Sequence, residues 1–314
     1  MNLVFCGTPQ FAVPSLERLV ADGFNIQLVV TQPDRPQGRG METGLSAVKQ
    51  SALNLKLPVV QPERIKNNEE FRAKLVQILP DAIVVVGYGR IIPPWMLHLP
   101  RLGNINVHAS LLPKYRGAAP IQWAIANGEI ATGVTTMHIN EGLDTGDILM
   151  QQEVPILPDE TAVTLSPRLA VLGSELLVKT LRGLGHGQLT PTPQDNSQAT
   201  LAPILKREDG QIDFNRTAVE IHNRLRGFQP WPGAYTQFRG RILKVIAVRP
   251  SGLLPDLAPG ELRVVGDQLF AGCGTATTLE LLQVQPEGKK PMPARDFIAG
   301  YRPTTHDLAE RSVT

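Results

Sequence analysis

One apolar run in the sequence places an amide and an imidazole where they could act together. Asn106 and His108 alternate there with Ile105 and Val107. Because side chains alternate across a β-strand, the amide and the imidazole should share one face. Prolines and glycines follow within residues 113–120, so the chain should leave the strand as a loop, which is where open α/β sheets carry their chemistry.

An amide and an imidazole on one face could stabilise an oxyanion. Both can donate hydrogen bonds, and each donor aimed at a developing oxyanion lowers the barrier by about 3 kcal/mol. A carboxylate beside the imidazole would favour its charged form and could relay protons. Asp144, in the loop 140–147, is the candidate. Each side chain also has a structural interpretation, since strand-end Asn and His are often ordinary hydrogen-bonding groups and Asp often caps a turn.

The segments before this strand predict a parallel sheet. Residues 2–6 and 26–31 are apolar enough to be buried strands, and a helical stripe lies between them. Two strands joined by a helix predict a parallel βαβ beginning. The first turn holds Gly7 but lacks the Gly-x-Gly-x-x-Gly pattern, which argues against a dinucleotide site. Further strands are expected at 82–87, 134–139 and 148–154, and further helices at 71–79, 121–125 and 161–181.

Two glycine-rich segments should follow strand ends. Residues 32–47 combine proline, glycine and charge, so they cannot bury much apolar surface and are expected to form a long mobile loop. Residues 87–93 contain Gly87 and Gly89. Glycines there would let the backbone approach a flat ligand closely, and they would equally suit a plain turn.

The second half of the chain predicts a small β-domain after a linker. Residues 185–204 are rich in proline and glycine and hold few large apolar side chains. Short strands with turns then follow a helix near residues 219–228, which favours a small barrel or sandwich. The expected fold is therefore an α/β domain with a Rossmann-like, mostly parallel sheet over residues 1–184, the linker, and a C-terminal β-barrel domain, OB-like, over residues 205–314.

Basic residues are frequent in this second domain. Scattered surface arginines are ordinary, but a small barrel with a cationic face is also a common nucleic-acid platform. The whole chain has a formal net charge of only +2, so bulk charge does not identify such a partner. The basic residues are Lys206, Arg207, Arg216, Arg224, Arg226, Arg239, Arg241, Lys244 and Arg249.

Composition narrows the class of protein. The 314 residues, 42% hydrophobic and 19% charged, are typical of a globular protein of about two domains. Cys6 and Cys273 lie far apart without metal-ligand spacing, which fits two inert thiols in a reducing compartment. The six histidines show no paired ligand spacing, so no metal is expected. With no signal peptide and no apolar run of membrane-spanning length, we expect a cytoplasmic protein.

Several motifs together resemble one family. The string N-x-H-x-S-L-L-P at 106–113 is followed by Y-R-G-A-A-P at 115–120 and G-L-D-T-G-D at 142–147. In this arrangement the chain resembles the folate-dependent formyltransferases, and within them those that act on an initiator tRNA. The similarity extends over most of the chain, to F-C-G-T-P-Q-F at 5–11, Q-P-D-R-P at 32–36, A-T-L-A-P at 199–203 and P-W-P-G-A-Y at 230–235.

The resemblance implies a substrate pair and a set of site residues. The formyl donor would be 10-formyltetrahydrofolate, and the acceptor would be the α-amino group of methionyl initiator tRNA. Asn106, His108 and Asp144 would be the catalytic trio. The donor would be bound by Gly89, Arg90, Ile91 and Ile92 and by Ser110, Leu111, Leu112 and Pro113. The tRNA would be contacted by Arg39, Lys206 and Arg207, although family members often carry further lysines where this chain has Met41 and Glu42.

Two other functions remain open from the sequence. The first is the same folate chemistry on a small amine, such as glycinamide ribonucleotide or an amino sugar on a nucleotide. The basic second domain and the 230–235 block argue against it, because a small acceptor needs no such platform. The second is a noncatalytic RNA-binding protein, against which the intact trio argues. We expect a monomer without membrane contact.

Overall fold

The computed structural model describes residues 1–37, 42–252, 254 and 256–308, and the chain divides into two compact units. Unit 1 comprises Met1–Pro120, Ala131–Pro155 and Thr164–Pro203, and unit 2 comprises Ile121–Ile130, Ile156–Val163 and Ile204–Thr314. Two segments from within the expected first domain, residues 1–184, thus group with the second unit, and most of the expected linker groups with the first. The periodicity of the sequence cannot show which unit these segments or the linker belong to, because that depends on contacts between residues far apart in the sequence.

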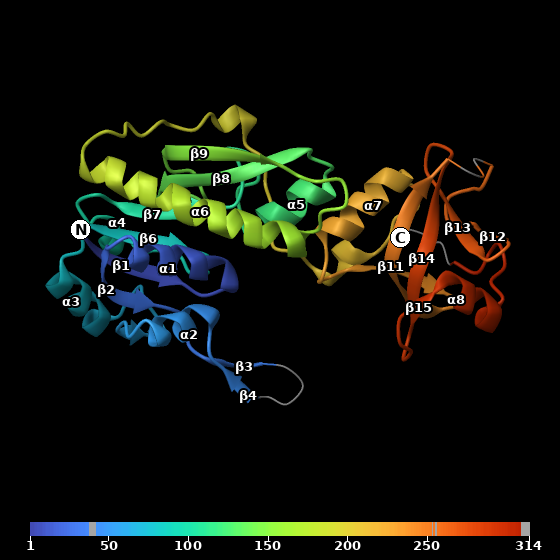
Figure 1. Cartoon of the computed structure of the whole chain (residues 1–314), viewed down its shortest axis with the longest axis horizontal. Coiled ribbons are helices and arrows are strands. Elements are labelled where there is room, and N and C mark those ends of the chain that lie inside the picture. The colour runs from blue at the N-terminus through green and yellow to red at the C-terminus, as the bar shows by residue number, and fades with distance from the viewer. Residues whose placement is uncertain (38–41, 253, 255, 309–314) are drawn as a thin grey trace. The chain divides into compact units, whose positions relative to one another are not determined.

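Unit 1 is built on a seven-stranded sheet with the order β5-β2-β1-β6-β7-β8-β9 (Figure 1). The five strands from β5 to β7 run parallel, whereas β8 and β9 pair antiparallel. This confirms the expected Rossmann-like, mostly parallel sheet. The strands are β1 (Asn2–Gly7), β2 (Asn25–Val30), β5 (Val59–Val60), β6 (Ala82–Val86), β7 (Asn104–His108), β8 (Ala131–His138) and β9 (Ile148–Pro155).

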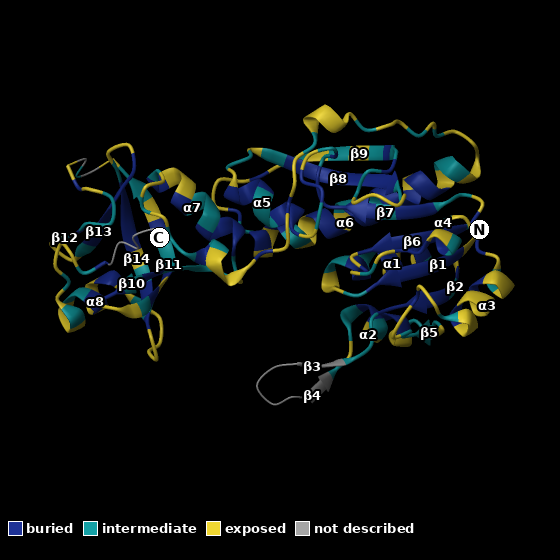
Figure 2. Ribbon diagram, turned by 180° about the vertical axis from the view of Figure 1, so that it is seen from behind, coloured by how far each residue is buried: buried dark blue, intermediate teal, exposed yellow. Residues whose placement is uncertain are grey.

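Strands at the centre of this sheet are buried on both faces. Leu3, Val4, Phe5 and Cys6 on β1 are all 0% exposed, as expected when helices cover a parallel sheet. Figure 2 shows buried strands in this unit, while the helices carry exposed residues on their outer sides. The helices are α1 (Val13–Ala21), α2 (Ala47–Asn54), α3 (Glu69–Ile78), α4 (Pro94–Leu97) and α6 (Ala162–Gly185).

Helix α6 packs closely on the strands that carry the candidate site. Gly173 lacks a side chain where α6 crosses β7 and β8, and a Cβ there would lie 2.8 Å from Val107 Cγ1 and 3.3 Å from Val134 Cγ1. The glycine therefore permits a backbone approach that a larger residue would prevent. Pro167 lies inside this helix, beyond the first turn.

The segment 32–47 differs from the long loop that its composition predicted. Backbone hydrogen bonds pair β3 (Arg35–Gln37) with β4 (Glu42–Gly44) as a two-stranded antiparallel hairpin. Such a pairing needs no apolar side chains, so a composition argument misses it. Arg39 lies outside the described residues.

Unit 2 is a separate antiparallel sheet with the order β10-β11-β14-β13-β12, and β15 pairs with β14. This confirms the expected β-rich second domain. Its core contains Phe238 and Phe297, whose rings meet edge to face at 5.0 Å. The strands are β10 (Ala234–Phe238), β11 (Arg241–Ser251), β12 (Leu262–Val265), β13 (Gln268–Cys273), β14 (Thr277–Pro286) and β15 (Met292–Pro293), and the helices are α5 (Pro120–Ala126), α7 (Ala218–Gly227) and α8 (Ala294–Tyr301).

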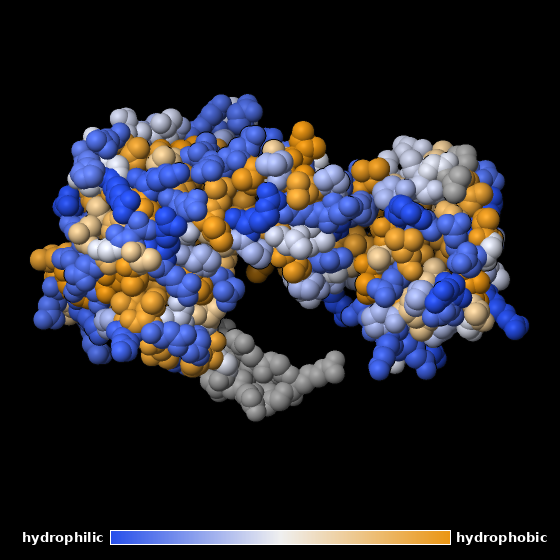
Figure 3. Space-filling view, viewed as in Figure 1, coloured by the Kyte–Doolittle hydropathy of each residue, from blue (hydrophilic) through white to orange (hydrophobic). Residues whose placement is uncertain are grey.

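The surface and the thiols add two observations. Polar and apolar side chains are interspersed over the face seen in Figure 3, and in the part of the chain that is described no helix has the length and apolar character to cross a bilayer. Cys6 and Cys273 are free and buried. Burial raises the pKa of the Cys273 thiol to about 12 and that of Cys6 further, so neither supplies a thiolate near neutral pH.

Candidate active site

The end of β7 brings together the three side chains that the sequence selected. Asn106 and His108 lie on this strand, and Asp144 comes from the loop between β8 and β9. The Asn106 amide Nδ2 donates to Asp144 Oδ1 at 3.4 Å, and His108 Nδ1 lies 3.7 Å from Asp144 Oδ2. The side chains of His108 and Asp144 are 7% and 15% exposed. An amide, an imidazole and a carboxylate therefore meet in a largely buried position.

The two imidazole nitrogens of His108 have different surroundings. Nε2 lies 2.8 Å from the main-chain oxygen of Tyr115. A carbonyl oxygen only accepts, so Nε2 carries the hydrogen in this contact. Nδ1 is then the nitrogen that faces Asp144 and remains available to exchange a proton. The sequence predicts that His108 can donate to an oxyanion, and in the structure the Nε2 hydrogen is used by the loop after β7.

Asp144 does not cap its own turn. Asn140 does so, since its Oδ1 accepts from Gly142 N at 3.0 Å and from Thr145 Oγ1 at 2.8 Å. The Asp144 carboxylate instead accepts a hydrogen bond from Gly117 N at 2.8 Å. Its backbone has a φ of 51°, a left-handed conformation that Asp tolerates better than most residues. The turn-capping role considered for Asp144 is therefore filled by Asn140.

The loop that follows β7 is held by side chains of the antiparallel strands. Thr135 Oγ1 on β8 donates to Ser110 O at 2.6 Å and accepts from Leu112 N at 3.1 Å. Gln151 Nε2 on β9 donates to Leu112 O at 2.8 Å. Ser110 is fully buried and its hydroxyl donates to Lys114 O at 2.6 Å. The polar groups of this expected donor loop are therefore largely committed to its own conformation, and Leu112 packs in the core at 3% exposure.

The loop after β6 lies at the same edge of the sheet, because β6 runs parallel to β7 with Val85 opposite Asn106. Gly87 and Gly89 have φ values of 55° and 74°, so the turn alone accounts for both glycines. Within the expected donor-binding group, Ile92 is buried whereas Ile91 is 88% exposed.

Two further contacts complete this loop. The Arg90 guanidinium donates to the Glu63 carbonyl oxygen. Gln32 Nε2 donates to Tyr88 O at 2.8 Å. The backbone of the loop is thereby held in place, while the Ile91 side chain presents an apolar surface that a flat ring could contact.

One residue near the trio was not identified from the sequence. Gln194 Nε2 donates to the main-chain oxygens of Asp144 at 2.9 Å and Gly146 at 2.7 Å. Its Oε1 accepts from Arg116 Nη2 at 2.7 Å and Nε at 3.1 Å. Gln194 comes from the segment expected to be a linker, fifty positions after Asp144, and nothing in its local sequence indicates this contact.

The same segment adds a short ladder of backbone bonds to the loop after β7. Arg116 N donates to Thr200 O at 2.9 Å, and Ala202 N donates back to Arg116 O at 2.7 Å. Thr200 Oγ1 accepts from Tyr115 N at 2.8 Å. The expected linker is thus bound to unit 1 beside the candidate site.

The basic residues of unit 2 are less available than the sequence suggested. Several pair with acidic groups: Arg216 with Asp213, Arg239 with Asp307 and Arg249 with Glu280. Lys206 and Arg207 are exposed, as are these three arginines. Arg39, the third residue expected to contact tRNA, lies outside the described part of the chain.

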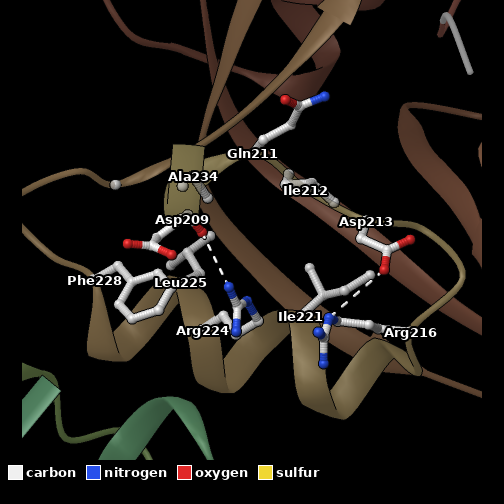
Figure 4. A pocket seen from close by; sticks show the side chains of 12 residues that line it. Asp209, Gln211, Ile212, Asp213, Arg216, Ile221, Arg224, Leu225, Phe228 and Ala234 are labelled. Carbon is white, nitrogen blue, oxygen red and sulfur yellow. Dashed lines mark hydrogen bonds and ion pairs between the residues drawn. The ribbon is translucent and has the colours of Figure 1, made fainter. Parts of the chain in front are cut away.

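Unit 2 also contains a small pocket between α7 and the start of β10 (Figure 4). Its arginines pair with other groups that line the pocket. Arg224 Nη2 donates to Asp209 O at 3.2 Å, and Arg216 Nε lies 3.7 Å from Asp213 Oδ2. The Arg224 guanidinium also stacks over the Phe228 ring at 4.8 Å. These contacts hold α7 in place. Within the described residues, no three His, Cys, Asp or Glu side chains are grouped so that they could bind a metal ion.

The sequence matches known proteins over nearly its whole length. Residues 1–181 match the formyl transferase family, and residues 204–302 match the C-terminal domain of formyl transferases. The chain is 66% identical over 311 residues to the methionyl-tRNA formyltransferase of Koribacter versatilis, covering 99% of each chain. It is 60% identical over 300 residues to that of Acidobacterium capsulatum, covering 96% of each.

Solved structures resemble the fold at lower identity. A sugar 3N-formyl transferase, WlaRD, solved with dTDP and 5-N-formyl-THF, has a TM-score of 0.67 at 20% identity, with 92% of this chain and 99% of that chain covered. An N-formyltransferase from Helicobacter canadensis, in complex with folinic acid and dTDP-3-aminofucose, has a TM-score of 0.66 at 21% identity, covering 90% and 98%. At this identity the similarity concerns the fold alone.

Proposed function

The chain belongs to the formyl transferase family, on the branch of the methionyl-tRNA formyltransferases, and from this premise we propose how its residues carry out the reaction. The enzyme transfers the formyl group of 10-formyltetrahydrofolate to the α-amino group of methionyl initiator tRNA. Asn106, His108 and Asp144 perform the transfer in unit 1, and the enzyme works in the cytoplasm as a monomer. The observation that carries the proposal is the convergence of these three side chains at the end of β7.

Asn106 is the donor for the oxyanion. Formyl transfer from nitrogen to nitrogen passes through a tetrahedral carbon bearing a negatively charged oxygen. An amide NH2 group carries two hydrogens, so one stays available when the other contacts Asp144. A donor held in place before the reaction stabilises this charge without reorganisation. The charged form of His108 adds a positive potential at the same position.

Asp144 and His108 move the protons. The attacking ammonium group must lose protons, and the leaving folate nitrogen must gain one. The Asp144 carboxylate, fixed by Gly117 N at 2.8 Å, takes a proton from the amine through water. His108 Nδ1, 3.7 Å from the carboxylate, is close enough to share that proton after a small side-chain movement or through water. As the bond between the formyl carbon and the folate nitrogen breaks, the shared proton passes through water to that nitrogen, and the second proton lost by the ammonium group goes to solvent.

The loops at the sheet edge bind the donor. The residues are those expected from the sequence, Gly89 to Ile92 and Ser110 to Pro113. The exposed Ile91 side chain fits contact with a flat ring, and the backbone of 110–113 is held rigid by Thr135 and Gln151. A rigid loop loses less entropy on binding. Arg39, Lys206 and Arg207 contact the tRNA.

Substitution at the trio tests the assignment. Asn106→Ala should lower kcat about 10²- to 10³-fold, as expected when one preorganised donor is removed. His108→Ala should lower kcat about 10²- to 10⁴-fold, as expected when a proton-transfer group is removed. In both variants the Kd for methionyl initiator tRNA should change less than twofold. His98→Ala, at an exposed position after α4, is the matched histidine control and should leave kcat unchanged. A His108→Ala enzyme within about threefold of the wild-type rate would contradict the proposal.

The acceptor is tested separately. Formyl transfer is measured to methionyl initiator tRNA, glycinamide ribonucleotide and a dTDP-linked amino sugar at equal concentration, with 10-formyltetrahydrofolate as donor. Transfer to the tRNA alone is expected. Faster transfer to either small amine would refute the tRNA assignment, and absence of any folate turnover would favour a noncatalytic RNA-binding protein.

A further inference from the structure

We infer that Gln194 is a positioning residue for the reaction. It holds the Asp144 loop against the loop that follows β7, so that the carboxylate stays where the amine and the imidazole can reach it. The inference rests on the proposed function, because it assigns Gln194 a role through Asp144. By this inference a residue of the expected linker helps to position the Asp144 carboxylate, a role that no local sequence pattern indicates.

The first step of the argument is a closed ring of hydrogen bonds. The Asp144 carboxylate accepts from Gly117 N at 2.8 Å, and Arg116 precedes Gly117 in the chain. The Arg116 guanidinium donates to Gln194 Oε1 at 2.7 Å, and Gln194 Nε2 donates to Asp144 O at 2.9 Å. Gln194, from the expected linker (residues 185–204), therefore connects the Asp144 loop with the loop that follows β7.

The second step is the chemistry of the amide. Nε2 donates to two carbonyl oxygens, which only accept, and also lies 4.0 Å from the Met137 sulfur, a weak acceptor. The partner of Oε1 is a guanidinium, which only donates. Only one orientation of the amide satisfies all these contacts. Among the common side chains, Glu has the same length but no donor, so it cannot replace Gln here.

The third step concerns the loop that Gln194 holds. Asp144 has a φ of 51°, and a Cβ at Gly146 would lie 1.8 Å from His138 O. A loop with a left-handed residue and so close a backbone approach keeps its conformation only if its surroundings stabilise it. Gln194 bonds the carbonyl groups of these same two residues, Asp144 and Gly146.

Gln194→Glu is the discriminating variant. It keeps an acceptor for Arg116 but places a carboxylate against two carbonyl oxygens, so the Asp144 loop should move. We expect kcat for formyl transfer to fall 10- to 100-fold, with KM for 10-formyltetrahydrofolate and Kd for the charged tRNA within twofold of wild type. Gln198→Glu is the matched control, because Gln198 lies in the same segment and is exposed, and its side-chain amide donates to Ser197 Oγ at 3.5 Å, away from the Asp144 loop. This variant should retain the wild-type kcat.

A double-mutant cycle separates positioning from general stability. If Gln194 acts through Asp144, adding Gln194→Glu to Asp144→Asn should lower the single-turnover rate less than threefold further. Amide hydrogen exchange provides a second readout: Gln194→Glu should accelerate exchange in residues 140–147 and leave that of β1 and β6 unchanged, which also verifies folding.

The outcomes distinguish the two proposals. A wild-type kcat in Gln194→Glu, fully multiplicative rate losses in the cycle, or unchanged exchange at 140–147 would each overturn the inference about Gln194. If Asp144→Asn itself keeps a near wild-type rate, the assignment of Asp144 fails, and the role of Gln194 through it fails for that separate reason. If Asp144→Asn is inactive beyond detection, the exchange result decides.

Discussion

At the scale of single residues, the loop 140–147 holds two residues of the turn-capping type that have different partners. Asn140 and Asp144 lie four positions apart in one loop, and both are residues that commonly cap turns. Asn140 accepts the two hydrogen bonds of the turn, which leaves the Asp144 carboxylate to meet Gly117 N and His108. The same loop therefore supplies one structural and one proposed catalytic side chain.

A carboxylate of unit 2 gives a prediction about acid stability. Asp307 accepts from Arg239 Nη2 at 2.6 Å and from Thr304 N at 2.7 Å. The Arg239 hydrogen bond is the main reason that the pKa of Asp307 is lowered from 3.8 to about 2. Because the folded pKa lies below the unfolded one, the stabilisation is present above about pH 4 and is lost as the pH falls toward 2.

The substitution Asp307→Asn should therefore lower the free energy of unfolding at pH 6 by about 0.5–1 kcal/mol, a small value because Arg239 is half exposed and solvent screens the pair. The difference from wild type should disappear near pH 2. Urea unfolding of the full chain at several pH values measures it. Asp296→Asn, which removes a weaker surface pair at 3.5 Å, should show little difference at any pH. If the difference in free energy of unfolding between wild type and Asp307→Asn stayed constant with pH, the lowered pKa of Asp307 would not be its cause.

At the scale of elements, a helix fixes the position of the strand that carries the site. Gly173 lets α6 approach Val107, and Val107 lies between Asn106 and His108 on β7. Val107 is 4% exposed and its branched side chain has few alternative rotamers. Any displacement of α6 from the sheet should therefore also move the two polar side chains.

Gly173→Ala should destabilise the protein although alanine is the better helix former. The added Cβ would lie 2.8 Å from Val107 Cγ1, and overpacking of this kind costs about 1–3 kcal/mol. Gly300→Ala in α8 is the matched control, because no atom of the described residues lies within 4 Å of its added Cβ. This variant should stabilise the protein by up to about 1 kcal/mol. Urea denaturation compares the two variants. If both variants shift the urea midpoint in the same direction, the close contact at Gly173 does not determine the effect of the substitution.

At the scale of the whole molecule, the proposed chemistry and much of the proposed tRNA binding belong to different units. The trio lies in unit 1, while Lys206 and Arg207 lie near the start of the longest segment of unit 2, Ile204–Thr314. With a formal net charge of +2, affinity for a polyanion must come from particular residues and not from the charge of the whole chain.

Removing these charges should weaken tRNA binding without slowing chemistry. Lys206→Ala and Arg207→Ala should each raise the Kd for methionyl initiator tRNA and lower the slope of log affinity against log salt by about 0.7–0.9 per lost phosphate contact. The kcat at saturating tRNA should stay at the wild-type value. Lys74→Ala on α3 removes the same charge from an exposed position in unit 1 and should change neither quantity. An unchanged salt slope in both variants would contradict the proposal that Lys206 and Arg207 contact the tRNA.

The sequence by itself determined the order of most elements and the candidates for chemistry, but it predicted a loop where β3 and β4 form a hairpin. Strand and helix periodicity is local, so the mostly parallel sheet, the β-rich second half and the alternation of Asn106 with His108 could be predicted. The tertiary structure decided which groups meet. It brought Asp144 to β7 across the sheet edge, used the Nε2 hydrogen of His108 on Tyr115 O, and laid the expected linker against the site so that Gln194 contacts the loop fifty residues before it. Contacts of that kind depend on the packing of distant segments, for which a sequence carries no local pattern.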